Sequence, residues 1–108
     1  MKFELFQNKK NDSYYFNLAN SNGQLILKSR IYRSKPSAQN GIQSVKANAP
    51  NPDRYQLLVA RNKKPYFNLK AANGHIIATS QQYATTASMN KTIKSIREQA
   101  AKADIVVQ

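Results

Sequence analysis

Hydrophobic and polar residues alternate over several short segments of the chain, each bounded by polar turn residues. Alternation with a period of two is typical of strands that are buried on one face. The pattern predicts strands over residues 3–6, 14–19, 24–28, 55–59, 66–71 and 75–79, with a last short strand over 104–107.

Two longer segments carry apolar residues at the spacing of a helix. Their apolar stripes are Ala38, Ile42, Val45 and Ala49 in the first, and Met89, Ile93, Ile96 and Ala100 in the second. Ser34 and Thr85 precede these segments and are candidate N-caps, because a hydroxyl accepts a hydrogen bond from the first helical turn. We expect both helices to bury their stripes against the strands.

The chain contains an internal repeat. Tyr15-Phe16-Asn17-Leu18 recurs 51 residues later as Tyr66-Phe67-Asn68-Leu69. The same offset relates further pairs along the chain, among them Asn22-Gly23 and Asn73-Gly74, Ile26 and Ile77, Ser29 and Ser80, Tyr32 and Tyr83. Pro50 and Pro52 end the first helix and mark the linker. We expect a single domain over residues 1–108, made of repeat one (1–52) and repeat two (53–108).

One repeat is too small to bury its own apolar face. We therefore expect an α+β fold, in which two tandem β(3)-α-β units form one antiparallel sheet with both helices on one face, related by a pseudo-two-fold axis. Such a chain is a covalent pseudo-dimer, so we expect a monomer. The Asn-Gly pairs predict type I′ hairpin turns, with positive φ at both residues.

Several of these segments resemble the YegP-like family of small bacterial proteins, which are uncharacterised. The resemblance rests on the repeated Tyr-Phe-Asn-Leu run with its Asn-Gly turn, and on the segments Ser29–Tyr32, Ser80–Tyr83 and Asn40–Lys46. It implies the tandem β(3)-α-β fold and an exchange of terminal strands between the repeats. It implies no activity. Repeat two departs from the pattern where Lys91-Thr92-Ile93 replaces Asn40-Gly41-Ile42.

The composition restricts the chemistry. The chain has 17 Lys and Arg against 5 Asp and Glu, a net charge of +12, which favours a polyanionic partner such as nucleic acid, an acidic protein or anionic lipid. A generally basic, solvated surface is the alternative. Cysteine is absent, which excludes disulfides, thiolate metal sites and cysteine catalysis. No apolar stretch suits a signal peptide or a membrane span, so we expect a cytoplasmic protein.

Catalytic groups are few. His75 is the only histidine, the acids show no local pairing, and the chain lacks a phosphate-binding glycine loop. We therefore expect no enzyme activity, no metal and no cofactor.

Strand alternation nevertheless selects one candidate binding face. Phe16 and Leu18 would point into the core, which leaves the opposite face to Tyr15, Asn17, Tyr66, Asn68 and Lys70. Aromatic, amide and basic groups together can stack nucleobases or hold a peptide. Cross-strand pairing that only stabilises the sheet is the alternative. A candidate anion cluster surrounds the entry to the first helix, with Lys28, Arg30, Arg33 and Lys35.

The sequence therefore predicts a non-catalytic binding or accessory domain whose partner is unknown. The alternative is a nucleic-acid binder that uses the basic surface and the aromatic sheet face.

Overall fold

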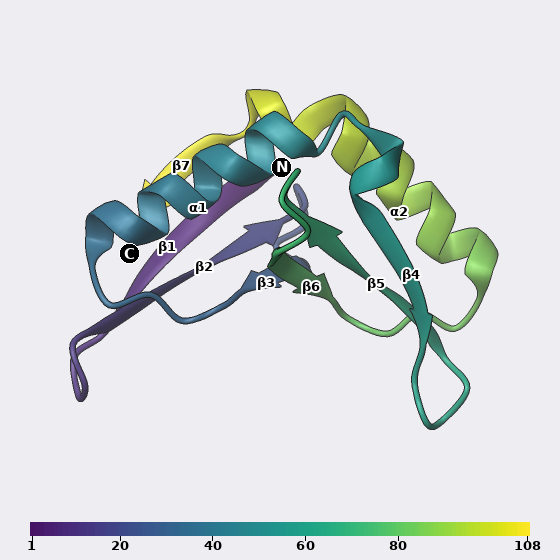
Figure 1. Ribbon diagram of the computed structural model, residues 1–108, viewed down its shortest axis with the longest axis horizontal. Coiled ribbons are helices and arrows are strands. Elements are labelled where there is room, and N and C mark those ends of the chain that lie inside the picture. Colours follow the sequence, from purple (N-terminus) through teal and green to yellow (C-terminus); the bar gives the residue numbers. More distant parts are fainter.

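A computed structural model describes residues 1–108 as seven strands and two α-helices (Figure 1). The strands are β1 (Lys2–Asn8), β2 (Ser13–Ala19), β3 (Leu25–Ser29), β4 (Tyr55–Val59), β5 (Pro65–Lys70), β6 (Ile76–Ser80) and β7 (Asp104–Val107). The predicted strands are all present, and their ends differ from the predicted ones by at most two residues.

All seven strands belong to one sheet, in the order β4-β5-β6-β3-β2-β1-β7. The two repeats meet at the centre, where β3 and β6 pair antiparallel. This arrangement confirms the α+β fold with its pseudo-two-fold relation. The sheet is mixed rather than wholly antiparallel, because β7 crosses from repeat two and runs parallel to β1.

Helices α1 (Lys35–Asn48) and α2 (Thr86–Gln99) cover one face of the sheet and leave the other face open (Figure 1). Both predicted N-caps are confirmed: Ser34 Oγ accepts from Ser37 N at 3.2 Å, and Thr85 Oγ1 accepts from Ser88 N at 3.1 Å. Short 3-10 helices, η1 (Pro52–Arg54) and η2 (Ala100–Lys102), connect α1 to β4 and α2 to β7. Neither α-helix has the length and apolar composition needed to cross a membrane.

The two helices pack differently on the sheet. Gly41 of α1 lies so close to the sheet that a Cβ added there would be 2.9 Å from Phe16 Cε2 and closer still to the Tyr32 ring. Repeat two has Thr92 at this position. Accordingly Ile42 is fully buried, whereas the corresponding Ile93 is only half-buried. The glycine therefore permits the closer approach of α1.

A β-bulge decides which face of the third strand is buried. Leu18 pairs with Leu27 and Ala19 pairs with Leu25, so Ile26 is an extra residue in β3. A bulge lets two consecutive side chains face the same side. Ile26 and Leu27 are accordingly both buried. Repeat two has the same irregularity, where Leu69 pairs with Ala78 and Lys70 with Ile76.

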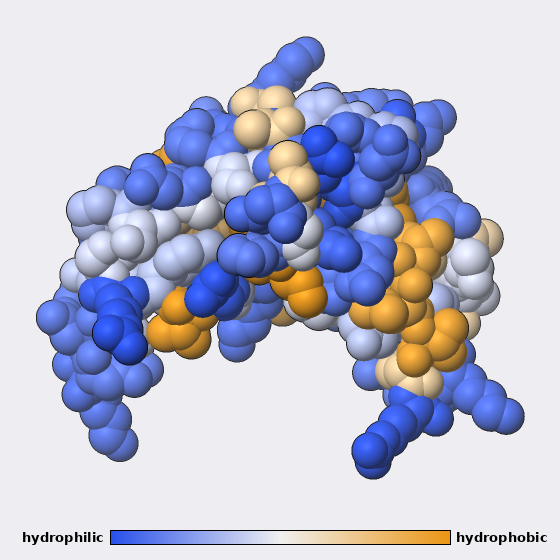
Figure 2. All heavy atoms as spheres, in the orientation of Figure 1, coloured by the Kyte–Doolittle hydropathy of each residue, from blue (hydrophilic) through white to orange (hydrophobic).

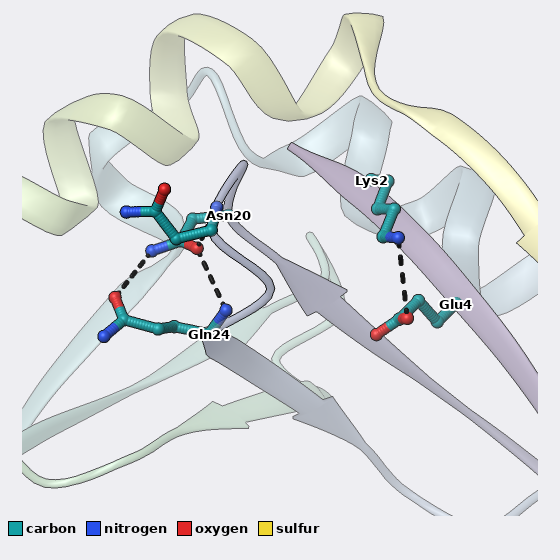
Figure 3. A network of polar contacts seen from close by, with 5 residues as sticks. Lys2, Glu4, Asn20 and Gln24 are labelled. Atoms are coloured by element: carbon teal, nitrogen blue, oxygen red, sulfur yellow. Dashed lines mark hydrogen bonds and ion pairs between the residues drawn. The ribbon is translucent and has the colours of Figure 1, made fainter.

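The Asn-Gly hairpins do not form the predicted type I′ turns. Gly23 and Gly74 have φ of +82° and +87°, whereas neither Asn22 nor Asn73 has a positive φ. In the first hairpin Gly23 N donates to Asn20 O and Asn20 N donates to Gln24 O, which closes a three-residue loop. Such a loop needs the left-handed region only at its last position. Figure 3 shows how the Asn20 side chain bonds across this turn to Gln24, both to its backbone N–H at 3.0 Å and to its side-chain oxygen at 2.9 Å.

Two serines perform the same task in the two repeats. Ser29 Oγ accepts from Phe16 N and Ser80 Oγ accepts from Phe67 N, each at 2.9 Å. Each hydroxyl then donates to the carbonyl of the next residue. These serines therefore satisfy backbone groups where the third strand of each repeat leaves the sheet.

Candidate functional site

A row of polar side chains crosses the open face of the sheet. The register places its members opposite one another on six neighbouring strands, in the order Glu4, Asn17, Lys28, Thr79, Asn68 and Gln56. These positions alternate with buried ones such as Leu5, Leu18 and Leu69. The six side chains, called the polar row below, therefore point away from the helices.

In repeat two the polar row is internally hydrogen-bonded. Asn68 Nδ2 donates to Gln56 Oε1 at 3.1 Å, and Thr79 Oγ1 donates to Asn68 Oδ1 at 2.7 Å. Asn68 is buried among these neighbours. Its amide already has partners on both sides, so this half of the row is held in place before any ligand arrives.

In repeat one the corresponding side-chain amide, that of Asn17, is not fully hydrogen-bonded. The side-chain oxygen of Asn17 is buried and has no hydrogen-bond partner. Its neighbour Glu4 forms an ion pair with Lys2 at 3.9 Å and has no proton to donate (Figure 3). Its other neighbour, Lys28, extends to the Tyr15 ring, where Nζ lies 5.5 Å from the centroid. A buried acceptor without a donor costs free energy, so a ligand that displaced the side chains covering this oxygen and supplied a donor would be stabilised there.

The two open-face tyrosines have different neighbours. Tyr15 stacks on Phe6 of β1, with ring centroids 5.0 Å apart and an interplanar angle of 16°. Tyr66 lies opposite Leu58 of β4 instead. Both tyrosines are half-buried, on the face that the helices leave uncovered. Repeat one therefore presents an aromatic pair with a lysine beside it, and repeat two presents a single ring.

A shallow hollow of about 390 Å³ lies on the open side of the central strands β3 and β6. Its lining combines apolar Leu25 and Ile76 with Lys28, Arg30 and Thr79. Lys28 and Thr79 are members of the polar row, so the hollow interrupts the row at the junction of the two repeats. Lys70, the remaining predicted site residue, pairs with Ile76 and is half-buried.

The predicted anion cluster does not converge on one point. Lys28 lies over the Tyr15 ring, while the Arg30 guanidinium lies 5.9 Å from the centroid of the Tyr32 ring. Arg33 and Lys35 are exposed at the start of α1, where the Ser34 hydroxyl already caps a backbone N–H. The structure thus links Lys28 and Arg30 to the hollow on the open side of the sheet and leaves Arg33 and Lys35 at the helix entry.

Elsewhere the ionisable groups are dispersed. No group of three or more His, Asp and Glu side chains is placed to hold a metal ion. His75 is exposed after the second Asn-Gly turn, and its backbone N–H donates to Asn73 Oδ1 at 3.0 Å. Burial raises the pKa of three tyrosines under the helices, Tyr32, Tyr55 and Tyr83. These groups hold the helices to the sheet and lie away from the polar row.

The sequence pattern predicted the two tyrosines, the two asparagines and Lys70 on the open face and Lys28 in the anion cluster. It did not predict Glu4, Gln56 and Thr79, which complete the polar row. Their position in the row depends on the register between paired strands, and for Thr79 also on the pairing of β3 with β6, which lie far apart in the chain. The available signal was the strand alternation, which already placed Glu4 and Gln56 out of phase with the apolar positions of their strands.

Comparison with known proteins agrees with the repeated architecture. A family model described as a domain of unknown function, DUF1508, matches the chain twice, over residues 9–56 and 60–106. A UPF0339 protein of Shewanella oneidensis is 52% identical over 88 residues, which is 82% of this chain and 80% of the relative. The UPF0339 protein YegP of Escherichia coli is 47% identical over 95 residues, 88% of this chain and 86% of YegP.

Two solution NMR structures share the fold. The structure of a UPF0339 protein from Shewanella oneidensis has a TM-score of 0.90 at 46% identity, over 98% of this chain and 89% of its own. That of YegP from Escherichia coli has a TM-score of 0.89 at 41% identity, over 99% and 91%. YegP is itself described as a protein of unknown function. With its two DUF1508 matches and these relatives, the chain belongs to the uncharacterised DUF1508 family of UPF0339, or YegP-like, proteins.

Proposed function

We propose that the protein is a non-catalytic binding domain that holds its partner on the open face of the sheet. The partner contacts Tyr15, Asn17, Tyr66, Asn68 and Lys70. The observation that carries this proposal is the polar row, which crosses both repeats without a covering helix and contains, in repeat one, the unpaired amide oxygen of Asn17. The same fold satisfies the corresponding amide of Asn68, so the unpaired oxygen of Asn17 calls for an explanation, and ligand binding supplies one.

Charge selects the class of partner. The net charge of +12 attracts polyanions, and two lysine pairs lie on the hairpin turns that flank the open face, Lys9-Lys10 and Lys63-Lys64. Figure 1 shows both hairpins projecting past the sheet on the side away from the helices. A ligand on the open face is therefore approached by positive charge from two sides.

Single-stranded nucleic acid is the second candidate, favoured by the Phe6–Tyr15 pair with Lys28 beside it. Bases stack on exposed aromatic rings, while lysines compensate the phosphates. An acidic protein segment would use the same lysines and the free acceptor of Asn17 but would not need the rings.

The test uses two probes on isotope-labelled protein, a ten-residue thymidine oligonucleotide and a glutamate-rich peptide. We expect amide shifts in β2, β3, β5 and β6 for at least one probe, and an affinity that falls steeply as salt rises from about 50 to 200 mM. If only the oligonucleotide causes these shifts, the function is nucleic-acid binding. If only the peptide does, the partner is an acidic protein.

A matched pair of variants separates the open face from general basicity. Lys28→Gln with Lys70→Gln removes two charges from the face, whereas Lys91→Gln with Lys94→Gln removes two from exposed positions of α2. We expect only the first pair, and Tyr15→Ala with Tyr66→Ala, to weaken binding by tenfold or more. Equal losses in the two lysine pairs, or no open-face shifts with either probe, would refute the proposal.

A further inference from the structure

The two repeats end differently at the outer edges of the sheet. On one edge, β7 covers β1 with four residue pairs, from Lys2 and Asp104 to Leu5 and Val107. On the other edge, β4 is the last strand, and no strand lies outside it. Because β4 holds in repeat two the place that β1 holds in repeat one, the chain covers only one of two equivalent edges.

The linker explains why the second cover is missing. Residues 104–107 form β7, and the repeat offset carries them back onto residues 53–56. In repeat one that segment forms η1 and the first residues of β4. The residues that correspond to a covering strand therefore lead directly into repeat two and do not cover β4.

The outer edge of β4 carries unpaired backbone groups. Phe67 N donates to Ser80 Oγ on the β6 side, so the pair of Phe67 and Leu57 is not hydrogen-bonded across β4 and β5. Leu57, and Val59 two residues on, therefore direct their backbone polar groups outward. At the equivalent place in repeat one, Leu5 O accepts from Gln108 N at 2.8 Å.

The side chains of β4 are also less well covered than those of β1. Leu5 is 1% exposed, whereas Leu57 at the corresponding position is 56% exposed and Val59 is 69% exposed. Figure 2 shows the resulting hydrophobic patch on the flank of the molecule where Figure 1 places β4. An uncharged, proline-free edge strand of this kind is a template for an added strand, and proteins usually protect it. Residues 55–59 contain neither a charged residue nor a proline.

We propose that the edge of β4 binds an extended, acidic segment of another protein, which adds to the sheet as an eighth strand parallel to β4. β7 shows the geometry, with Asp104 at its start and Ile105 and Val107 opposite the buried Phe3 and Leu5. The positive residues Arg54, Arg61, Lys63 and Lys64 lie at the two ends of β4 and favour acidic flanks. A second copy fits less well, because each copy carries a net charge of +12.

The probe is a synthetic peptide that joins two glutamates to the sequence of residues 103–108. It is added to the whole isotope-labelled chain, and amide shifts and hydrogen exchange are followed residue by residue. We expect saturable shifts and slowed exchange at Leu57 and Val59, with a dissociation constant of about 1 mM or lower, equivalent to roughly 4 kcal/mol. A peptide of the same composition in scrambled order should not bind.

Two variants and one control locate the site. Leu57→Lys places a charge on the edge, and Val59→Pro removes an outward N–H without touching the bonds to β5. Ile31→Lys makes the same change at a residue that is 58% exposed elsewhere. We expect the two β4 variants to bind the peptide at least tenfold more weakly than the parent. The control Ile31→Lys should bind it with unchanged affinity.

Three results would overturn the proposal. The first is the absence of shifts at Leu57 and Val59 at millimolar peptide, and the second is a response confined to β1, where the peptide merely replaces β7. The third is broadening of β4 resonances with protein concentration alone, which would assign the edge to a second copy. The polar row lies on the open face of the sheet, whereas this proposal concerns the outer edge of β4. The response of the row to the oligonucleotide therefore tests the proposed function separately.

Discussion

The phenolic ring of Tyr32 occupies the space that a side chain at Gly41 would need. The ring also stacks on Phe16, with centroids 6.2 Å apart, so helix, tyrosine and sheet are in mutual contact. In repeat two Tyr83 stacks on Phe67 in the same way, at 6.3 Å, beside Thr92. The same aromatic pair thus supports a close helix in one repeat and a more distant helix in the other.

Gly41→Ala should therefore destabilise the fold, although alanine is the better helix former by about 1 kcal/mol. The added methyl group forces Tyr32 or α1 to move, and overpacking of this kind costs roughly 1–3 kcal/mol. The control is Thr92→Ala at the equivalent position, which should be close to neutral. Urea unfolding of the two variants gives the comparison, and a Gly41→Ala protein as stable as the parent would contradict the packing described.

The second prediction concerns Lys63, which has a φ of +67° in the turn between β4 and β5. Lys63 N donates to Ala60 O and Ala60 N donates to Lys64 O, so Lys63 occupies the position that Gly23 fills in the β2–β3 hairpin. A side chain in the left-handed region costs about 1 kcal/mol. Lys63→Gly should raise the free energy of unfolding by up to about that amount, whereas Lys63→Ala, which keeps the strain, should not. Similar thermal midpoints for the two variants would mean that the turn is unstrained.

The third prediction uses the unequal burial of two matched isoleucines. Ile42→Ala should cost about 2–4 kcal/mol, as a fully buried truncation does. Ile93→Ala should cost less than half as much, because Ile93 is only half-buried. Chemical denaturation measures both. Equal losses would show that α2 is as closely packed as α1.

The fourth prediction concerns pH. Burial raises the pKa of Tyr55, whose hydroxyl donates to Ala49 O at 2.8 Å, and burial also raises the pKa of Tyr32 and Tyr83. A pKa that is higher in the folded than in the unfolded state stabilises the fold below the unfolded value. That contribution is complete below about pH 10 and is lost as the pH rises toward the folded values.

The free energy of unfolding should therefore decrease above about pH 10. Tyr55→Phe removes the ionisable group together with its hydrogen bond, so this variant should be less stable at neutral pH and should lose less on alkalinisation. Guanidinium titrations at several pH values, with tyrosinate absorbance as a parallel signal, measure both effects. A parallel pH dependence in parent and variant would exclude Tyr55 as a contributor.

Local patterns in the sequence predicted much of the fold. The two N-caps, the apolar stripes and the strand alternation each depend on residues close together in the chain. The repeat follows from comparing two such local patterns. Two local features that these patterns did not predict each depend on the backbone conformation of a single residue. The bulge at Ile26 turns two consecutive apolar residues to one side, and the turn at Asn22-Gly23 uses one left-handed residue rather than two.

Features that depend on distant pairing were less accessible. The polar row requires the register of six strands, and the parallel direction of β7 depends on where η2 leaves the end of α2. The difference between Asn17 and Asn68 depends on their neighbours, Glu4 and Lys28 in one repeat and Gln56 and Thr79 in the other. Identical motifs therefore predicted identical sites, whereas the partners across the strands made them unequal.

The linker at Pro50–Pro52 has a genetic consequence. In an assembly of two identical chains, every substitution is inherited by both halves at once, so a change that helps one half must be tolerated by the other. Joined in one polypeptide, the halves can mutate separately. This freedom permits one half to keep a hydrogen-bonded Asn68 and the other an unpaired Asn17, and it permits one edge to be covered while the other stays open. Tandem fusion thus turns a symmetric scaffold into one whose two halves can specialise.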